Sequence, residues 1–229
     1  MRALSRMQFS LVVTLVLLPH LAFAFGSTAV LDDFNRADGA LGSGWTAAVD
    51  AQHVGAPVIS TNTAKGTTNG GLNEAYWNAS TMGPASEAYL TLGGTANGED
   101  MMVYCRVTSP GASSNGYAVL YRPSGPFMRV RRIDSGAFTS LGADTTITAL
   151  GDGDKIGIEC NGSSITAYKY TSATWSSVVS VTDSTYSAAG YIGMAIGDSG
   201  SNAATGDDFG GGTLSSGVST QYFRLRVQP

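Results

Sequence analysis

The sequence predicts an all-β protein built from two antiparallel β-sheets that pack face to face. Apolar and polar residues alternate with a period of two in many short segments, which is typical of half-buried strands. After the first 24 residues, no segment keeps apolar residues at helical spacing for three turns. Turn signals rich in Gly, Asn and Pro separate the alternating segments. The clearest alternation lies in residues 100–107, 116–122, 127–133, 154–160, 164–170, 176–182 and 190–197.

The first 24 residues have the features of a secretory leader. Arg2 and Arg6 precede an apolar run over residues 9–24, which ends in a small-x-small cleavage motif at Ala24. The run is shorter than the ~20 apolar residues of a membrane-spanning helix, and Pro19 interrupts it. We therefore expect cleavage after Ala24, a secreted product and no membrane span in the mature chain.

Removing these 24 residues from 229 leaves 205, enough for one domain with its own core. We expect that domain over residues 25–211, followed by a Gly/Ser-rich tether and a last strand over residues 212–229. Without the two leader arginines the net charge of −4 becomes −6. An acidic domain with no dominant basic face is a poor candidate for nucleic-acid binding.

Cys105 and Cys160 are the two cysteines, and each lies in an alternating segment with its side chain predicted to face the core. In a secreted protein such a pair favours a disulfide. The alternative is two buried free thiols, which behave as small apolar side chains. Between the segments, the pair Asn161-Gly162 predicts a tight β-hairpin.

The tripeptide Asp-Asp-Phe occurs near both ends of the predicted domain. The first copy opens the segment DDFNRADGALGSGW, and the second closes a stretch that contains GDKIGIECNGSSITAYKY and GYIGMAIG. These segments resemble secreted bacterial and phage domains with the concanavalin A-like, laminin-G-like jelly-roll fold. The resemblance covers residues 30–211 and implies the fold far more than the function, because this fold hosts lectins, hydrolases, lyases and structural modules.

The resemblance implies that the first and last strands lie side by side, with Phe34 and Phe209 facing the core. Many relatives hold a structural calcium ion near this seam, and calcium prefers several oxygen ligands. The resemblance therefore implies a structural Ca2+ site whose ligands, in order of preference, are Asp33, Asp208, Asp32 and Asp207. The alternative is that these acids end strands in water and bind no ion.

No catalytic motif is evident. His53 is the only histidine after the leader, so neither a multi-histidine zinc site nor a supported Ser-His-Asp arrangement is available. None of the four glutamates follows the Glu-x-Asp-x-x-Glu pattern that places two carboxylates on one strand of jelly-roll glucanases. We expect no catalytic residues.

Exposed aromatic side chains are the usual platforms for the apolar faces of sugars. Trp77 is the leading candidate because it lies in a long polar stretch, residues 61–81, that we expect to be a loop. For every candidate, packing in the core is the alternative. The further aromatic candidates are Tyr76, Trp175, Tyr168 and Tyr170.

Arg129 and Arg131 share one face of a predicted hairpin in an otherwise acidic protein. Such a pair can bind an acidic glycan or a negatively charged partner. The alternative is the solvated face of an edge strand, which discourages aggregation. At the C-terminus, residues 221–227 alternate again and predict a strand that docks on its own sheet or on a neighbouring subunit, with self-association in the second case.

These features predict a secreted, non-catalytic carbohydrate-binding or adhesion module, stabilised by calcium, whose partner is a glycan or polysaccharide. One alternative is a glycan-cleaving enzyme, either a glycoside hydrolase or a polysaccharide lyase, on the same fold. A second alternative is a structural subunit of a surface layer, filament or virion.

Overall fold

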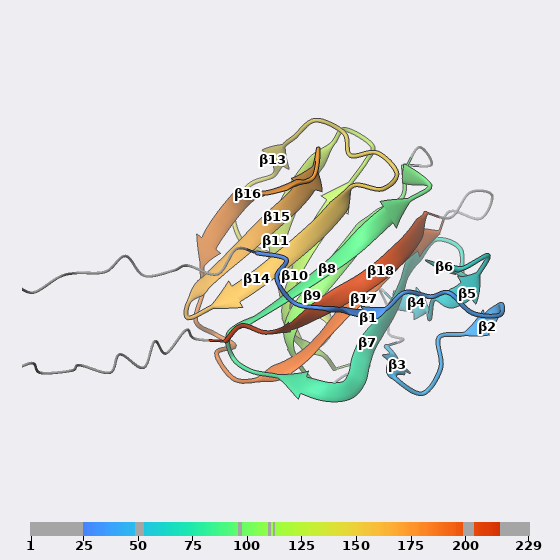
Figure 1. Cartoon of the computed structure of the whole chain (residues 1–229). Coiled ribbons are helices and arrows are strands. Elements are labelled where there is room, and N and C mark those ends of the chain that lie inside the picture. The colour runs from blue at the N-terminus through green and yellow to red at the C-terminus, as the bar shows by residue number, and fades with distance from the viewer. Residues whose placement is uncertain are drawn as a thin grey trace, which may run out of the picture.

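The structure, a computed structural model, describes residues 25–48, 53–95, 98–109, 111, 113–198 and 204–215. No described residue lies in an α-helix, and nearly all regular structure is β-strand. The strands form two sheets that pack face to face, as Figure 1 shows. This arrangement confirms the predicted two-sheet sandwich. The predicted leader and the strand at 221–227 lie outside the described residues, and within those residues no helix is long and apolar enough to cross a membrane.

The first sheet brings together both ends of the described chain. Its strands are β1 (Val30–Asp32), β2 (Gly39–Ala40), β5 (Val58–Ser60), β6 (Thr63–Lys65), β8 (Ser86–Gly93), β14 (Lys155–Asn161), β15 (Ser164–Thr171), β16 (Thr174–Thr182) and β18 (Thr205–Thr213). Their order is β16-β15-β14-β8-β18-β6-β5-β2, and β1 pairs with β18. The turn at Asn161-Gly162 joins β14 to β15 as the sequence predicts, with Asn161 opposite Ser164.

The second sheet covers the other side of the core. Its strands are β3 (Trp45–Ala47), β4 (His53–Gly55), β7 (Gly71–Met82), β9 (Met101–Thr108), β10 (Asn115–Arg122), β11 (Phe127–Asp134), β12 (Ala137–Ser140), β13 (Thr145–Thr146) and β17 (Gly190–Asp198). The order is β12-β11-β10-β9-β17-β7-β3, with β13 on β11 and β4 on β7. Of the described pairings, only that of β4 with β7 is parallel.

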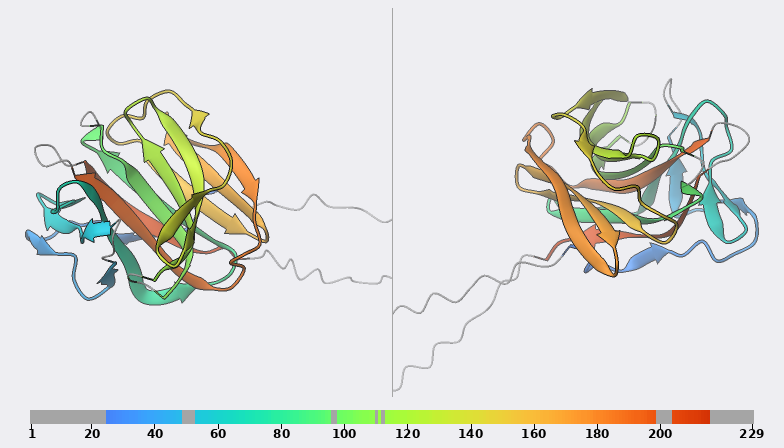
Figure 2. Two further views of the ribbon diagram at one scale, coloured as in Figure 1. Left: turned by 180° about the vertical axis from the view of Figure 1, so that it is seen from behind. Right: turned by 90° about the horizontal axis from the view of Figure 1, so that it is seen from above.

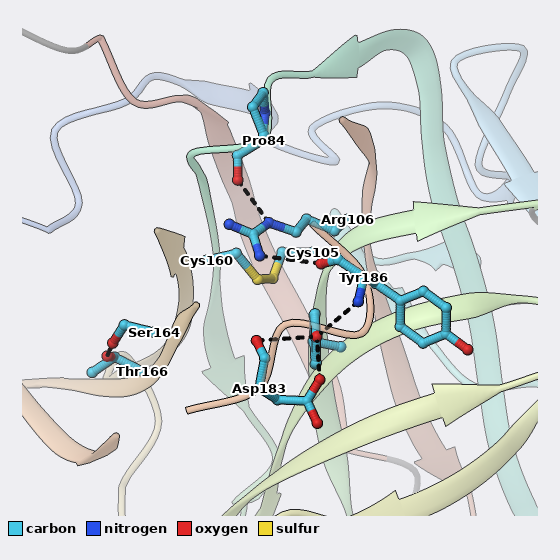
Figure 3. The surroundings of a disulfide bond; sticks show 9 residues. Pro84, Cys105, Arg106, Cys160, Ser164, Thr166, Asp183 and Tyr186 are labelled. Atoms are coloured by element: carbon cyan, nitrogen blue, oxygen red, sulfur yellow. Dashed lines mark hydrogen bonds between the residues drawn. A yellow bond between two sulfur atoms is a disulfide. The ribbon is translucent and has the colours of Figure 1, made fainter. Parts of the chain in front are cut away.

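The core lies between the sheets and is crossed by a disulfide. Cys105 on β9 and Cys160 on β14 are both fully buried, and their Cα atoms are 6.4 Å apart. Beside them, Arg106 is 1% exposed, and its guanidinium donates to the Pro84 carbonyl at 2.6 Å and to the Tyr186 carbonyl at 3.1 Å (Figure 3). Burial lowers the pKa of Arg106. These bonds tie the second sheet to the loops that lead into β8 and β17.

Three local predictions are wrong. Residues 61–81 were predicted as a loop but form most of β6 and β7, because the polar residues of β7 lie on a strand with neighbours on both edges. β11 is not an edge strand, since it pairs with β10 on one side and with β12 and β13 on the other. Residues 212 and 213, predicted to begin the tether, belong to β18, and Gly212 lies opposite Glu87.

Candidate functional site

The two Asp-Asp-Phe tripeptides meet at the seam between β1 and β18. Asp32 lies opposite Phe209 in the β1–β18 register, and Phe34 and Phe209 are both fully buried. This placement agrees with the predicted pairing of the first and last strands. The seam therefore brings the two ends of the domain together in the first sheet, with Phe34 and Phe209 in the core.

Asp32 is engaged by the protein's own donors. One carboxylate oxygen accepts the Phe34 N–H at 2.9 Å and Nη1 of Arg36 at 2.6 Å, and the other accepts Nη2 of Arg36 and the indole N–H of Trp45, at 2.9 and 2.8 Å. Arg36 also donates to the Leu41 carbonyl at 2.5 Å. Burial acts to raise the pKa of Asp32, but these bonds outweigh it and hold that pKa below its usual value. The opening motif is thus a local cluster of hydrogen bonds around one buried carboxylate, that of Asp32.

The other acids at the seam do not complete a calcium site. Asp33 accepts the Asn35 N–H at 3.1 Å, Asp207 accepts the Asp208 N–H at 2.8 Å, and Asp208 lies 3.9 Å from the Lys155 ammonium. Burial, and then the charges of Asp208 and Asp33, raise the pKa of Asp207. Within the described residues, no three His, Cys, Asp or Glu side chains lie close enough to hold a metal ion. The seam does not fit the expected Ca2+ ligand set, because the Arg36 cation occupies Asp32.

Trp77 and Tyr76 are not exposed platforms. Trp77 faces the core from β7, opposite Trp45, and the two indoles meet edge to face at 5.4 Å. Tyr76 points to the other side of the strand, where it is fully buried against Tyr104 at 5.5 Å. Successive residues of a strand point to opposite faces, and both faces of β7 are covered here. The loop interpretation that favoured these residues therefore fails.

Tyr168, Tyr170 and Trp175 do come together on the outer face of the first sheet. Tyr170 lies opposite Trp175, and their rings are 5.1 Å apart. The cluster is already packed by the chain itself, since Phe25 stacks on Tyr168 at 4.0 Å and meets Trp175 edge to face at 4.7 Å. Only part of each predicted aromatic residue therefore remains accessible.

Arg129 and Arg131 lie on the outer face of the second sheet, as their spacing predicts. In the β10–β11 register Arg129 is opposite Leu120, Arg131 is opposite Ala118, and both partners belong to the fully buried cluster on this face. Figure 2, left, shows this sheet from its outer side. Arg129 and Arg131 therefore lie next to buried apolar side chains of β10.

A row of arginines and phenylalanines runs along this face. The Arg122 guanidinium binds Asp100 at 2.5 and 2.7 Å, and both Arg122 and Arg129 lie over the Phe127 ring, at 5.4 and 5.3 Å. Arg129 also forms an ion pair with Asp144. We call this row, together with Arg131 and Phe138, the arginine row. It combines half-buried guanidinium groups with two aromatic rings, of which that of Phe127 is buried beneath Arg122 and Arg129.

Arg131 differs from the other members of the arginine row. Its guanidinium lies over the Phe138 ring at 5.0 Å, and within the described residues it forms no ion pair and its Nε has no hydrogen-bond partner. Burial lowers the pKa of Arg131, and the charge of Arg129 lowers it further. Because desolvated charge is costly unless it is paired, this group is ready to bind an anion.

Small residues of β17 form the middle of this face. Gly193 and Ala195 lie between Tyr76 and Glu74 on β7 and the residues of β9 on the other side. Next to them, the Tyr104 hydroxyl donates to Glu74 at 3.1 Å, with both side chains fully buried. Where β17 ends there is a hollow of about 320 Å³, lined by residues 70–72 and 98–100 with Gly197 and Asp198. Asp100 links this hollow to Arg122.

The sequence alone does not identify Asp100, Arg122, Tyr104 and Glu74 as part of this face. Glu74 lies on β7, Tyr104 on β9 and Arg122 at the end of β10, and Asp100 directly precedes β9. Only the order β10-β9-β17-β7 brings them together. Alternation does place Arg129 and Arg131 at positions that share a face. That was the one signal of the arginine row available in the sequence.

Neither a family model nor a curated protein matches the sequence. Solved structures do match. A carbohydrate binding module, CBM66 from Bacillus subtilis, aligns with a TM-score of 0.54 at 16% identity over 76% of this chain and 98% of the other. The fold is a concanavalin A-like jelly roll.

Other jelly rolls align over similar shares of the chain. The VIP36 exoplasmic/lumenal domain, in its Ca2+/Man-bound form, has a TM-score of 0.54 at 12% identity, over 82% of this chain and 86% of the other. A Bacillus subtilis protein with a galectin-like fold has a TM-score of 0.52 at 12% identity, over 73% and 88%. At these identities the likeness establishes the fold and not the ligand.

Proposed function

We propose that this jelly roll binds carbohydrate through the outer face of its second sheet, at the arginine row and the adjoining hollow. Sugars combine apolar C–H faces with many hydroxyl groups, so a site for them needs ring surface beside polar donors and acceptors. Phe138 supplies partly exposed ring surface, and Arg122, Arg129 and Asp100 supply charged hydrogen-bonding groups. The sugar-binding neighbours of the same fold support this choice.

The observation that carries the proposal is Arg131. It is a largely desolvated cation with no carboxylate partner among the described residues, on a face where Arg122 and Arg129 each have one. The ligand that best completes such a face carries its own carboxylate or sulfate. We therefore propose an acidic glycan and a non-catalytic, adhesive role outside the cytoplasm, which the leader-like residues 1–24 and the disulfide also support.

The test compares two arginines of one strand. Replacing Arg131 with Met should weaken binding of a galacturonic-acid hexamer by about 10–100-fold, since a hydrogen bond to a charged group contributes ~1.5–3 kcal/mol. Arg132, which points to the other side of β11 and binds Asp134 and Asp183, is the matched control. Isothermal titration calorimetry with the acidic hexamer and a neutral galactose hexamer measures both effects.

The proposal predicts that Arg132→Met keeps the wild-type affinity and that the neutral hexamer binds weakly to every variant. Equal losses for Arg131→Met and Arg132→Met, with both proteins folded, would contradict the assignment of the face. Equal affinity for the acidic and neutral hexamers would contradict the acidic ligand.

A further inference from the structure

Residues 25–29, the N-terminal strap, cross the outer face of the first sheet before β1 begins, as Figure 1 shows. Phe25 is only 6% exposed, with its ring stacked on Tyr168. The ring lies over Gly157, where any Cβ atom would collide with it. Gly157 thus leaves a recess that Phe25, the first residue after the expected cleavage site, fills beside Trp175.

Glu87 fastens the strap. It is fully buried, and its two carboxylate oxygens accept the Gly26 N–H at 2.9 Å, the Thr28 N–H at 2.9 Å and the Thr28 hydroxyl at 2.7 Å. The Tyr89 hydroxyl adds a bond to the Thr28 carbonyl at 2.8 Å. Because these oxygens are buried and engaged, Glu87 is not available to a substrate.

A second carboxylate faces Glu87. Glu159 on β14 is directly opposite Glu87 in the β8–β14 register, an arrangement in which like charges destabilise a sheet. Burial, and also the charge of Glu87, raise the pKa of Glu159. Tyr89 and Tyr168 are the other titratable groups on this part of the face, and each has a raised pKa, first because of burial and then because of Glu87 or Glu159.

No ion pair among the described residues neutralises these two glutamates. The cation nearest along β14 is Lys155, four residues from Glu159, or about 13 Å along an extended strand. Its ammonium lies 3.9 Å from Asp208 and over the rings of Tyr89 and Tyr170. Glu87 is buried and has only three neutral donors, Glu159 beside it is half-buried, and neither has a counter-charge among the described residues.

We propose that hydrolysis of the Ala24–Phe25 peptide bond supplies this counter-charge. A leader peptidase adds water across the bond, leaving a carboxylate on Ala24 and an α-ammonium on Phe25. Adjacent backbone nitrogens lie within about 4 Å of each other, so the new cation forms one residue from the Gly26 nitrogen that already contacts Glu87. Leader removal therefore places one positive charge beside the two carboxylates as well as releasing the chain.

Cleavage at another peptide bond does not place a positive charge beside Glu87 and Glu159 while keeping Phe25 in its recess. A longer N-terminus places a neutral amide at Phe25 and moves the ammonium away, and a shorter one removes the ring that fills the Gly157 recess. The ordinary pKa of an α-amino group is about 7.7–8.0, and two neighbouring carboxylates raise it, so the group is charged at neutral pH. The strap is then held by charge pairing as well as by its hydrogen bonds.

The experiment compares two N-termini on the mature chain. One protein begins at Phe25 with a free amine, and the other carries one additional residue, a pyroglutamate, which has no charge. We expect the free-amine protein to melt about 2–6 °C higher at pH 7. N-terminal sequencing of the protein secreted from the full chain should begin at Phe25.

Glu159→Gln should change Tm in opposite directions in the two proteins, which a purely structural role of Glu159 would not produce. In the pyroglutamate protein it removes a repulsion and should raise Tm, whereas in the free-amine protein it removes a partner and should lower Tm. Glu99→Gln, in the segment that precedes β9 of the other sheet, is the matched control and should act equally in both. Secretion with a different first residue, identical Tm for the two N-termini, or the same effect of Glu159→Gln in both would overturn the proposal.

Discussion

Replacing Asp32 with Asn tests whether the opening motif is held by its own cation rather than by a metal. The substitution keeps the shape but removes the charge that binds Arg36, and it sets an amide NH2 against one of two donor pairs: Arg36 with the Phe34 N–H, or Arg36 with the Trp45 indole N–H. Asp32 is 9% exposed and Trp45 8%, so at least two donors lose their acceptor in a buried place. At ~1–3 kcal/mol for each buried unsatisfied group, we expect a loss of about 2–5 kcal/mol.

A loss of that size lowers Tm by about 5–15 °C in a domain of this length. Thermal unfolding followed by circular dichroism measures it, with the exposed neighbour Asp33→Asn as the matched control, for which we expect a change of less than about 2 °C. The pKa of Asp32 is lowered in the folded state, so its contribution is complete above the unfolded value of 3.8 and disappears as pH falls through the folded pKa. The gap in Tm between wild type and Asp32→Asn should therefore close at acid pH. Equal Tm values for Asp32→Asn and Asp33→Asn at pH 7 would show that the hydrogen bonds around Asp32 do not stabilise the fold as described.

Four further outcomes follow from the described contacts. Calcium should shift Tm by less than about 1 °C relative to EDTA, since Arg36 occupies Asp32; a larger shift that Asp208→Asn abolishes would restore the metal site. Trp77→Ala should cost about 2–4 kcal/mol in chemical denaturation, because its indole packs on Trp45; a loss below 1 kcal/mol would place it on the surface. Burial acts to raise the pKa of Asp183, but hydrogen bonds from Tyr117, Thr185 and Arg132 hold it at about 2. The wild type should therefore be more stable than Asp183→Asn above pH 4, and this difference in stability should disappear as pH falls to about 2. A difference in stability that does not change with pH would contradict these bonds. Replacing Cys105 and Cys160 together with Ala should cost about 2–4 kcal/mol, and an unchanged midpoint would show that the bond does not constrain the unfolded chain.

The sandwich was predictable because alternation with a period of two survives in the long strands. β9, β10, β11, β14 and β17 each lie within one residue of the segments that alternate in the sequence. This local pattern reports directly on a backbone that has few alternatives. The pairing of the chain ends was implied by the resemblance of the segments around the two Asp-Asp-Phe tripeptides to jelly-roll domains.

Burial of both faces explains the failures on β7. Alternation shows that Tyr76 and Trp77 point to opposite sides but not that each side is covered, one by the core and one by the buried cluster around Tyr104. The polar residues of β7 then gave the strand the appearance of a loop. Whether both faces of a strand are buried depends on the whole sheet and its surroundings, so the 12 residues of β7 alone do not reveal it.

Long-range register explains what the sequence could not show. Glu87 and Glu159 are 72 positions apart and meet only because β8 pairs with β14. Asp100 and Arg122 likewise meet through the β9–β10 pairing. The Asp32–Arg36 pair, by contrast, spans only four residues of one segment.

The most direct test of the central claim is a map of where an acidic oligosaccharide binds. We would titrate the 15N-labelled mature domain with the galacturonic-acid hexamer and follow the amide and arginine Nε–Hε signals by NMR. The account predicts that the largest shifts fall on β10 and β11, at Arg122, Phe127, Arg129 and Arg131, and that the Arg131 Nε–Hε signal moves most. Shifts confined to Tyr168, Tyr170 and Trp175 on the first sheet, or no shifts at millimolar ligand, would contradict it.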